Sequence, residues 1–447
     1  MTQYINQSKP VHILTKVCTV IILLLIFQIP TPAAKEFFQK DAQLYIPDAL
    51  ISLSSGHAIV VDKMTQKLFA FRYSKGGFHL VYESRCSTGK NNGTKMVSGD
   101  AKTPEGIYFA TKAYNDDELS SIYGIVAFRL DYPNFIDRKQ GCDGNNIWLH
   151  GTNKPLQAFQ TNGCVTLTNK DINNISKYIK LHETPIIIQD YTKWIPQDVR
   201  FSLKKKLENF LDQWTKSVVR GDSTMLESLY EDGSAIENTS LHNLVLKINK
   251  WKASGAKVSL RPSDISILKH DNCDVITFDQ ILSVDDRTLS GYHRKLFLKK
   301  DRANWRIIGD MLQSPATEKQ FIAKMQAWDD SIKNDLVIKQ LIEDWSKTWE
   351  SGDIKKYSSF YAPDFRAPGM NLKKWISYKT KVSHLNKDIQ IRIENVKISS
   401  GKKIMITTFK QKYTSSMHRD VGIKKLYFRK SHGQWKIYRE SWKAIKP

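Results

Sequence analysis

Apolar and polar residues alternate through most of the segment between about residue 55 and residue 190. His57–Tyr73 and Phe78–Gly89 each show this period of two, with polar residues between them, which is typical of a β-hairpin. Gly and Pro separate four more short stretches of the same kind: 103–110, 123–133, 145–152 and 163–168. A short helix over 169–182, with Ile172, Ile175 and Ile179 on one face, and a buried strand over 183–191 complete the pattern. This segment is predicted to be a mostly β domain, with 194–200 as a linker.

Beyond residue 200 the pattern changes and the chain repeats itself. Leu211–Tyr230 aligns with Ile342–Tyr361, since both contain a Trp, a Gly-Asp pair seven and eight residues later, and a Tyr. Each copy continues with a Lys-Trp pair and ends in two strands, the last of which carries a Trp. Helices followed by a meander of long strands indicate two α+β domains. We assign the Trp residues to their cores.

The N-terminus combines a basic start with a short apolar run. Lys9 and Lys16 precede or border Val17–Ile29, and small residues follow around Ala33. This order is typical of a secretory signal, because a membrane span needs roughly 20 apolar residues. An uncleaved N-terminal anchor stays open as the alternative for residues 1–34. We therefore expect the mature protein in the periplasm or cell envelope.

Composition and charge narrow the class of protein further. A chain of 447 residues should form two or three domains, and 41% hydrophobic residues suffice for packed cores. The net charge of +23 favours an anionic partner, such as nucleic acid, anionic lipid or a carboxylate-rich polymer. No helix-turn-helix, zinc-finger or RNP motif is found, and an exported protein does not meet nucleic acid. We expect no nucleic-acid partner.

The five cysteines show neither a CxxC pair nor regular spacing. Since exported proteins often form disulfides, a Cys86–Cys142 bridge is one interpretation, and free buried thiols are the other. Zinc needs three or four clustered ligands, and Cys142, His150 and Cys164 lack such spacing. We predict no metal site and no cofactor.

His150 and Cys164 are the residues that suggest chemistry. A cysteine nucleophile reacts as the thiolate, and a nearby imidazole can take its proton. Gly163 before Cys164 lets the backbone turn sharply, so that neighbouring N–H groups can hold an oxyanion. From spacing alone, a buried structural Cys and a core His remain the alternative.

Five segments in order resemble the L,D-transpeptidase (YkuD) family, in the periplasmic branch with NTF2-like C-terminal domains. They are "STGK", "GDAKTPEGIYF", "LDYPN", "IWLHGT" and "TNGCVTLTNKDI". The resemblance implies a YkuD-like catalytic domain over 55–192, and the repeats resemble NTF2-like (cystatin-like cone) domains over 201–315 and 332–447. It implies Cys164 as nucleophile, His150 as base and the Gly151 carbonyl as the group that orients the imidazole. Thr161 takes the Ser/Thr place of the family motif.

Two departures from the family motif concern substrate binding. Asn162 stands where many members have His, and it can donate a hydrogen bond near the oxyanion. Thr166 replaces an Arg that would suit a stem-peptide carboxylate, so Arg129 or Arg138 would have to compensate. We group Gly163, Asn162, Thr161 and Thr166 as expected oxyanion or substrate-binding residues.

The resemblance implies an exported cysteine acyltransferase that acts on peptidoglycan stem peptides. Cys164 would form a thioester and release D-alanine. An amine acceptor then gives L,D-transpeptidation, and water gives L,D-carboxypeptidation, in which a tetrapeptide is trimmed to a tripeptide. The alternative of another class is an inactive peptidoglycan-binding or assembly protein. The NTF2-like domains would bind a partner or self-associate.

Overall fold

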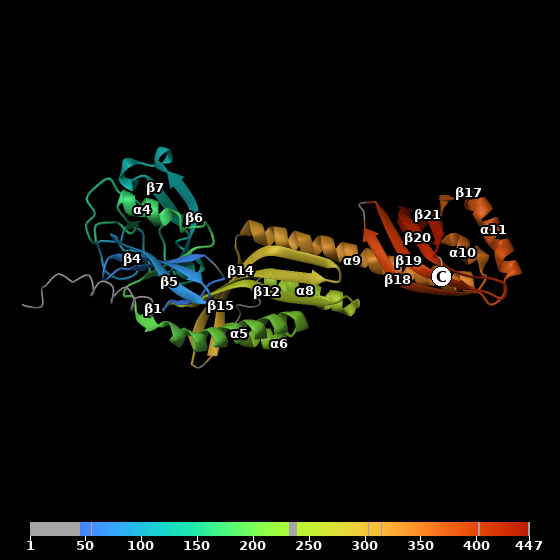
Figure 1. The fold of residues 1–447 in the computed structure, drawn as a ribbon, viewed down its shortest axis with the longest axis horizontal. Coiled ribbons are helices and arrows are strands. Elements are labelled where there is room, and N and C mark those ends of the chain that lie inside the picture. The colour runs from blue at the N-terminus through green and yellow to red at the C-terminus, as the bar shows by residue number, and fades with distance from the viewer. Residues whose placement is uncertain are drawn as a thin grey trace, which may run out of the picture.

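The computed structural model describes residues 45–445 apart from 55, 232–238, 303, 314 and 401–402. Three bodies follow one another along the long axis, and the long helix α9 runs from the middle body into the last (Figure 1). Among the described residues, no helix combines the length and apolarity needed to cross a bilayer. The predicted signal or anchor, residues 1–34, lies outside the described residues.

The first body, which we name the catalytic block because it contains the predicted catalytic residues Cys164 and His150, is a mixed sheet in the order β5-β4-β3-β10-β6-β7-β8-β9. Its central strands β3 and β10 are buried along almost their whole length, as expected for strands covered on both faces. Helix α4 packs its Ile172 and Ile175 into the core on one face. The strands are β3 (His57–Asp62), β4 (Lys67–Ser74), β5 (Gly77–Arg85), β6 (Gly106–Asn115), β7 (Val126–Leu130), β8 (Trp148–His150), β9 (Val165–Thr166) and β10 (Pro185–Gln189), and the helices are α3 (Phe135–Lys139) and α4 (Asn169–Ser176).

The second body, the first module, wraps a curved antiparallel sheet around helices. The sheet order is β15-β14-β13-β12-β2, with β2 contributed by the segment before the catalytic block. Its elements are α5 (Arg200–Arg220), α6 (Ser223–Leu229), α8 (Thr239–Ala253), β12 (Val258–Leu268), β13 (Asp274–Val284), β14 (Arg287–Asp301), β15 (Asn304–Leu312) and β2 (Leu50–Ser52).

The third body, the C-terminal module, has the same design. Its sheet runs β17-β16-β21-β20-β19-β18. The elements are α9 (Pro315–Glu350), α10 (Ile354–Ser359), β16 (Tyr361–Ala367), β17 (Met370–Asn371), α11 (Leu372–Leu385), β18 (Gln390–Ser400), β19 (Ile404–Thr414), β20 (Arg419–Ser431) and β21 (Gln434–Ala444). Helix α9 serves both modules, because Phe321 and Met325 pack in the first core and Ile338 and Trp345 in the second.

Each of the two modules contains a buried polar network of the same kind within its own core. In the first, Trp214 Nε1 donates to Tyr230 Oη over a separation of 16 residues, and Tyr230 Oη donates to Asp310, the ion-pair partner of Arg294. In the C-terminal module, Trp345 Nε1 donates to Tyr361 Oη, again 16 residues on, and Tyr361 contacts Glu440, the partner of Lys424. The repeat seen in the sequence is therefore a repeat of packing and hydrogen bonding. Trp214, Trp251 and Trp345 are core residues, as expected, whereas Trp305, Trp375 and Trp435 are only partly buried against the two cores.

The segment 194–200, expected to be a linker, is instead packed structure. Strand β11 (Trp194–Pro196) pairs with β1 (Tyr45–Pro47), and Trp194 packs against a core shared by the catalytic block and the first module. Phe69 and Phe71 of the first body meet Phe297 and Ile308 of the second in that core. The turn Gln197–Val199 and the buried Arg200 continue directly into α5. The sequence pattern could not show this, because the apolar residues that cover Trp194 come from distant segments.

Candidate functional site

Strands β8 and β9 place the candidate residues on one face of the sheet. The two strands are parallel, with Leu149 opposite Val165 and His150 opposite Thr166. Leu149 and Val165 are fully buried in the core. Because successive side chains of a strand point to opposite faces, His150 and Thr166 point away from that core. Cys164, two residues before Thr166, lies at the same edge.

His150 is buried and held at both ring nitrogens. Its Nδ1 lies 2.6 Å from the Gly151 carbonyl oxygen, so Nδ1–H donates to that carbonyl. This contact leaves the lone pair on Nε2, which lies 3.1 Å from the Thr166 hydroxyl. Burial lowers the pKa of His150, and the Gly151 hydrogen bond acts in the opposite direction. The imidazole is therefore neutral near pH 7, with Nε2 as its basic atom.

The Cys164 thiol is half-buried, directly before strand β9. Its Sγ donates to the Asn146 carbonyl oxygen, 3.6 Å away. Burial raises the pKa of Cys164, while the Trp148 backbone N–H and the Lys95 ammonium act to lower it. A raised thiol pKa and a lowered imidazole pKa together make the resting pair neutral. Such a thiol needs a general base when it reacts.

The turn before Cys164 depends on Gly163 and is braced by two hydroxyl groups. Gly163 has φ +132°, and a Cβ there would lie 2.8 Å from the Lys102 carbonyl oxygen. Thr161 Oγ1 accepts from Gly163 N and donates to the Cys164 carbonyl, and Thr103 Oγ1 donates to the Gly163 carbonyl. The polar groups of Gly163 and Thr161 are thus engaged within the turn.

The remaining expected residues differ in what they contact. Asn162 is exposed, and no hydrogen bond of its side chain is found among the described residues. Thr166 faces His150, so the expected substrate-binding hydroxyl lies against the base instead. Arg129 is exposed and pairs in register with Trp148, which puts it on the face of the thiol. Arg138 donates to the Pro133 carbonyl on α3 and is turned to its own backbone.

An aromatic wall beside His150 was not anticipated from the sequence. Trp148 is stacked on Tyr114 with ring centroids 4.9 Å apart, and Tyr123 covers Trp148 at 4.7 Å. Tyr123 also meets His150 edge-on at 5.0 Å. These tyrosines come from β6 and from the turn Ser121–Tyr123, so no local spacing in the sequence connects them with His150.

Cys86 and Cys142 are both free, which excludes the disulfide interpretation in this structure. Both are buried, and burial raises the pKa of each thiol. Cys142 Sγ lies 3.7 Å from Met96 Sδ. Among the described residues, no group of three or more His, Cys, Asp and Glu side chains is placed to hold a metal ion.

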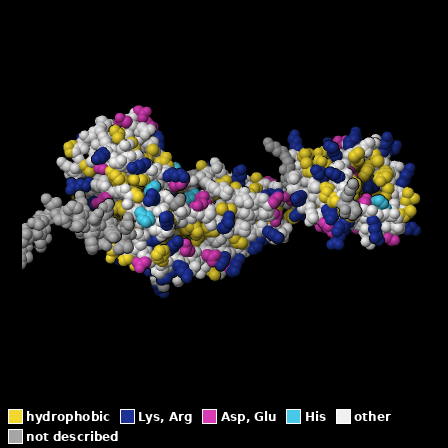
Figure 2. All heavy atoms as spheres, viewed as in Figure 1, with side chains coloured by type: hydrophobic (Ala, Val, Ile, Leu, Met, Phe, Trp, Pro, Cys, Tyr) yellow, Lys and Arg dark blue, Asp and Glu magenta, His cyan; other side chains and the backbone are white. Residues whose placement is uncertain are grey.

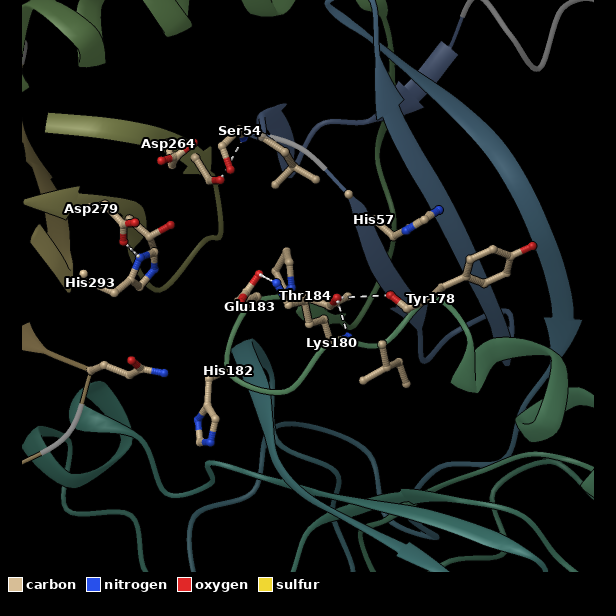
Figure 3. A pocket seen from close by; sticks show the side chains of 18 of the residues that line it. Ser54, His57, Tyr178, Lys180, His182, Glu183, Thr184, Asp264, Asp279 and His293 are labelled. Atoms are coloured by element: carbon tan, nitrogen blue, oxygen red, sulfur yellow. Dashed lines mark hydrogen bonds and ion pairs between the residues drawn. The ribbon is translucent and has the colours of Figure 1, made fainter. Parts of the chain in front are cut away.

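Two cavities lie away from Cys164. One, of about 640 Å³, separates the catalytic block from the first module; His57, His182 and Glu183 line it from one side and Asp279 and His293 from the other (Figure 3). His293 Nδ1 and Asp279 Oδ1 are 2.9 Å apart. The other cavity, of about 510 Å³, is in the C-terminal module and is lined by Trp345, Trp349, Trp375, Tyr378, Lys379 and Trp442, among others.

Thr166→Val should lower the pKa of His150 further below its usual value. The hydroxyl donates to neutral Nε2, but it can rotate and accept from Nε2–H once the ring is protonated, and charge-assisted hydrogen bonds are the stronger kind. Valine offers neither bond. An NMR titration of the His150 ring measures this shift, and Thr166→Ser, which keeps the hydroxyl, should stay near the wild type. A raised pKa in the valine variant would mean that the hydroxyl acts chiefly as a donor to the neutral ring.

Comparison with known proteins gives two family matches. Residues 56–188 match the L,D-transpeptidase catalytic domain (YkuD), and residues 337–441 match the Cds6 C-terminal NTF2-like domain. YafK of Escherichia coli (strain K12), named as an L,D-transpeptidase, is 30% identical over 94 residues, which are 21% of this chain and 35% of YafK. The matched stretch thus spans about a third of that relative.

Two solved structures are similar over most of this chain. Bd1075 of Bdellovibrio bacteriovorus is 22% identical with a TM-score of 0.30, and the match covers 90% of this chain and 99% of Bd1075. The helical cell shape determining protein Pgp2 of Campylobacter jejuni is 17% identical with a TM-score of 0.29, over 91% and 99% of the two chains. The two family matches, taken with the fold, identify residues 56–188 as an L,D-transpeptidase (YkuD) catalytic domain and residues 337–441 as a C-terminal NTF2-like domain.

Proposed function

We propose that this protein is an exported cysteine acyltransferase that acts on the stem peptides of peptidoglycan. The observation that carries the proposal is the pairing of His150 with Thr166, which lies two residues after Cys164, together with the Gly151 hydrogen bond that leaves Nε2 as the basic atom. The family match supplies the substrate class. On the same basis we propose residues 201–315 as a second NTF2-like domain, because its buried network repeats that of the C-terminal module.

The reaction begins with proton transfer from Cys164 Sγ–H to His150 Nε2. The thiolate attacks the carbonyl carbon of the third, diamino-acid residue, and the Asn162 amide is the exposed side chain next to this site that can donate to the oxyanion. The imidazolium then gives its proton to the leaving amine, the C–N bond to D-alanine breaks, and a thioester remains on Cys164. Thr166 steadies the imidazolium between these two steps.

Arg129 is the residue that we propose for the carboxylate of the stem peptide. It lies on the face of the thiol, whereas Arg138 is turned to the backbone of α3. A guanidinium binds a carboxylate through two parallel hydrogen bonds, which suits a substrate that ends in D-alanine. Arg129 would thus bind the carboxylate in place of the arginine that family members carry at the position of Thr166.

The acceptor decides between transfer and trimming. We propose transfer to an amine, L,D-transpeptidation, with L,D-carboxypeptidation to a tripeptide as the close alternative. Incubation with a disaccharide tetrapeptide and mass analysis of the products should distinguish them, with Cys164→Ala protein as the blank. A dimer joined through two diamino-acid residues supports transfer. Tripeptide alone, even with abundant amine acceptor, supports trimming, and no product from folded protein contradicts both.

One observation favours the binding alternative for the C-terminal module. Lys379 lies in the cavity of about 510 Å³ with its ammonium 4.2 Å from the ring centroid of Trp349 and 4.9 Å from that of Trp375. Burial, together with Lys424, lowers the pKa of Lys379 to about 8. A desolvated cation among aromatic rings suits an anionic group of a ligand. If the folded protein bound purified cell wall but showed no turnover of the tetrapeptide, this alternative would be favoured.

A further inference from the structure

Most of the net positive charge of this chain lies in the C-terminal module, one of two modules of similar design. Residues 332–447 contain 26 Lys and Arg against 10 Asp and Glu, whereas residues 201–315 contain 18 against 15. The two modules share the order of their four long strands and a buried network, so the fold itself does not require the excess. Figure 2 shows Lys and Arg side chains spread over the C-terminal module with few carboxylates among them.

The register of β18 to β21 puts many of these cations on the outer face of the sheet. The inner face is buried against helices, with Phe409, Leu426 and Phe428 in its core. Residues of opposite parity point outward, and directly paired residues share a face. Among those that point outward are Arg392, Lys410, Lys412, Lys425, Arg429 and Arg439.

Some of these cations lie close to one another, and a single carboxylate, Glu394, lies among those on β18 and β19. Arg392 lies directly opposite Lys412, and like charges in that position destabilise a strand pair. Glu394 bridges these two cations, at 3.1 Å and 2.8 Å. Lys410 lies directly opposite the same Glu394, and no ion pair of Lys425 or Arg439 with a carboxylate is found in the described part of the chain. Surface charge that served only solubility would intersperse both signs.

Two arginines of this face lie over tyrosine rings. The Arg429 guanidinium lies 5.4 Å from the ring centroid of Tyr438, and that of Arg439 lies 5.4 Å from the ring of Tyr427. The two rings meet edge-on at 6.2 Å. Arg429 already pairs with Asp364, whereas no ion pair of Arg439 is found among the described residues, so the N–H groups of Arg439 stay available for carboxylate oxygens.

We propose that the outer face of the β18–β21 sheet docks on the carboxylate-bearing strands of the peptidoglycan polymer. This inference rests on the proposed function for its choice of partner. The stem peptides repeat carboxylates along the polymer, which complements cations that repeat across neighbouring strands of the sheet. The face lies in a different module from Cys164, so docking would hold the enzyme on its substrate without occupying the site.

The test uses full-length Cys164→Ala protein, which binds without turnover, in a pelleting assay with purified sacculi. Adding Lys410→Gln, Lys425→Gln and Arg439→Gln together should weaken binding about 10-fold, since exposed charge pairs each contribute modestly. The matched control removes the same charge from the first module, through Lys257→Gln, Lys299→Gln and Lys300→Gln, and should bind nearly as the parent does. Added salt should weaken parent binding more than that of the first triple variant.

Equal binding by the two triple variants would overturn the proposal, as would failure of the folded parent to pellet with sacculi. Vesicles of phosphatidylglycerol form a second arm: loss of vesicle binding in the first triple variant, with sacculus binding unchanged, would assign the face to a membrane instead. Turnover of a soluble disaccharide tetrapeptide is measured separately with Cys164 restored. Absence of that turnover contradicts the proposed function and leaves the binding result to be judged by itself.

Discussion

Cys164→Ala should reduce product formation from a disaccharide tetrapeptide by roughly three orders of magnitude or more, because it removes the thiol on which the proposed acyl-enzyme forms. His150→Ala should cost nearly as much, since the pKa of the thiol is raised in this structure and the reaction needs a base. Residues that act as one unit give non-additive losses, so the double variant should be hardly worse than either single one. Mass analysis of the muropeptides measures all three.

The matched control is Cys142→Ala, which removes another thiol of the catalytic block. Cys142 is free and contacts Met96 rather than the strands that carry Cys164, so this variant should remain active. Near-ultraviolet circular dichroism should show each variant folded. Activity near that of the wild type in folded Cys164→Ala protein would remove Cys164 from the mechanism, whatever the family match.

The sequence predicted the elements around Cys164 well, because local patterns determine them. The alternation in β3 to β5, the glycine before Cys164 and the His-Gly pair are short-range signals, and they match the strands and contacts observed. The contact between Thr166 and His150 depends on the parallel register of β8 and β9, which are separated by a long connection. The spacing of residues along the chain gives no information about that register.

The larger differences between expectation and structure also come from contacts over long distances. The segment 194–200 is expected to be a linker because it follows the strand that closes the first block, yet its residues Trp194–Pro196 pair with β1. The net charge of the sequence did not show where Lys and Arg gather, because outward positions of neighbouring strands are far apart in sequence. The repeat was visible from its Trp and Gly-Asp spacing. The same spacing gave no sign of the ion pairs that complete the two networks, Arg294–Asp310 and Lys424–Glu440.

Lys295→Met should destabilise the catalytic block, although Lys295 belongs to the first module. Its buried ammonium lies 3.8 Å from Asp131 Oδ2, and 3.6 Å from the ring centroid of Phe109. Burial raises the pKa of Asp131, and Lys295 acts to lower it. Without Lys295 the carboxylate keeps the hydrogen bond from Phe109 N but loses its cation. The Asp131 side chain is one-quarter exposed. We therefore expect the free energy of unfolding to fall by about 2 to 3 kcal/mol, at the low end for a broken buried pair.

Urea denaturation of the full chain measures this loss, and two further variants show whether the ion pair causes it. Lys299→Met removes an exposed cation from the same strand and should change stability little. Lys295→Met with Asp131→Asn removes both charges and should recover most of the loss, because neutral partners leave no buried charge uncompensated. The two bodies already share a core in which Phe69 and Phe71 meet Phe297. If Lys295→Met proved no worse than Lys299→Met, the Lys295–Asp131 pair would contribute little to the contact between the two bodies, and the apolar core and other polar contacts such as Lys139–Glu231 would maintain it.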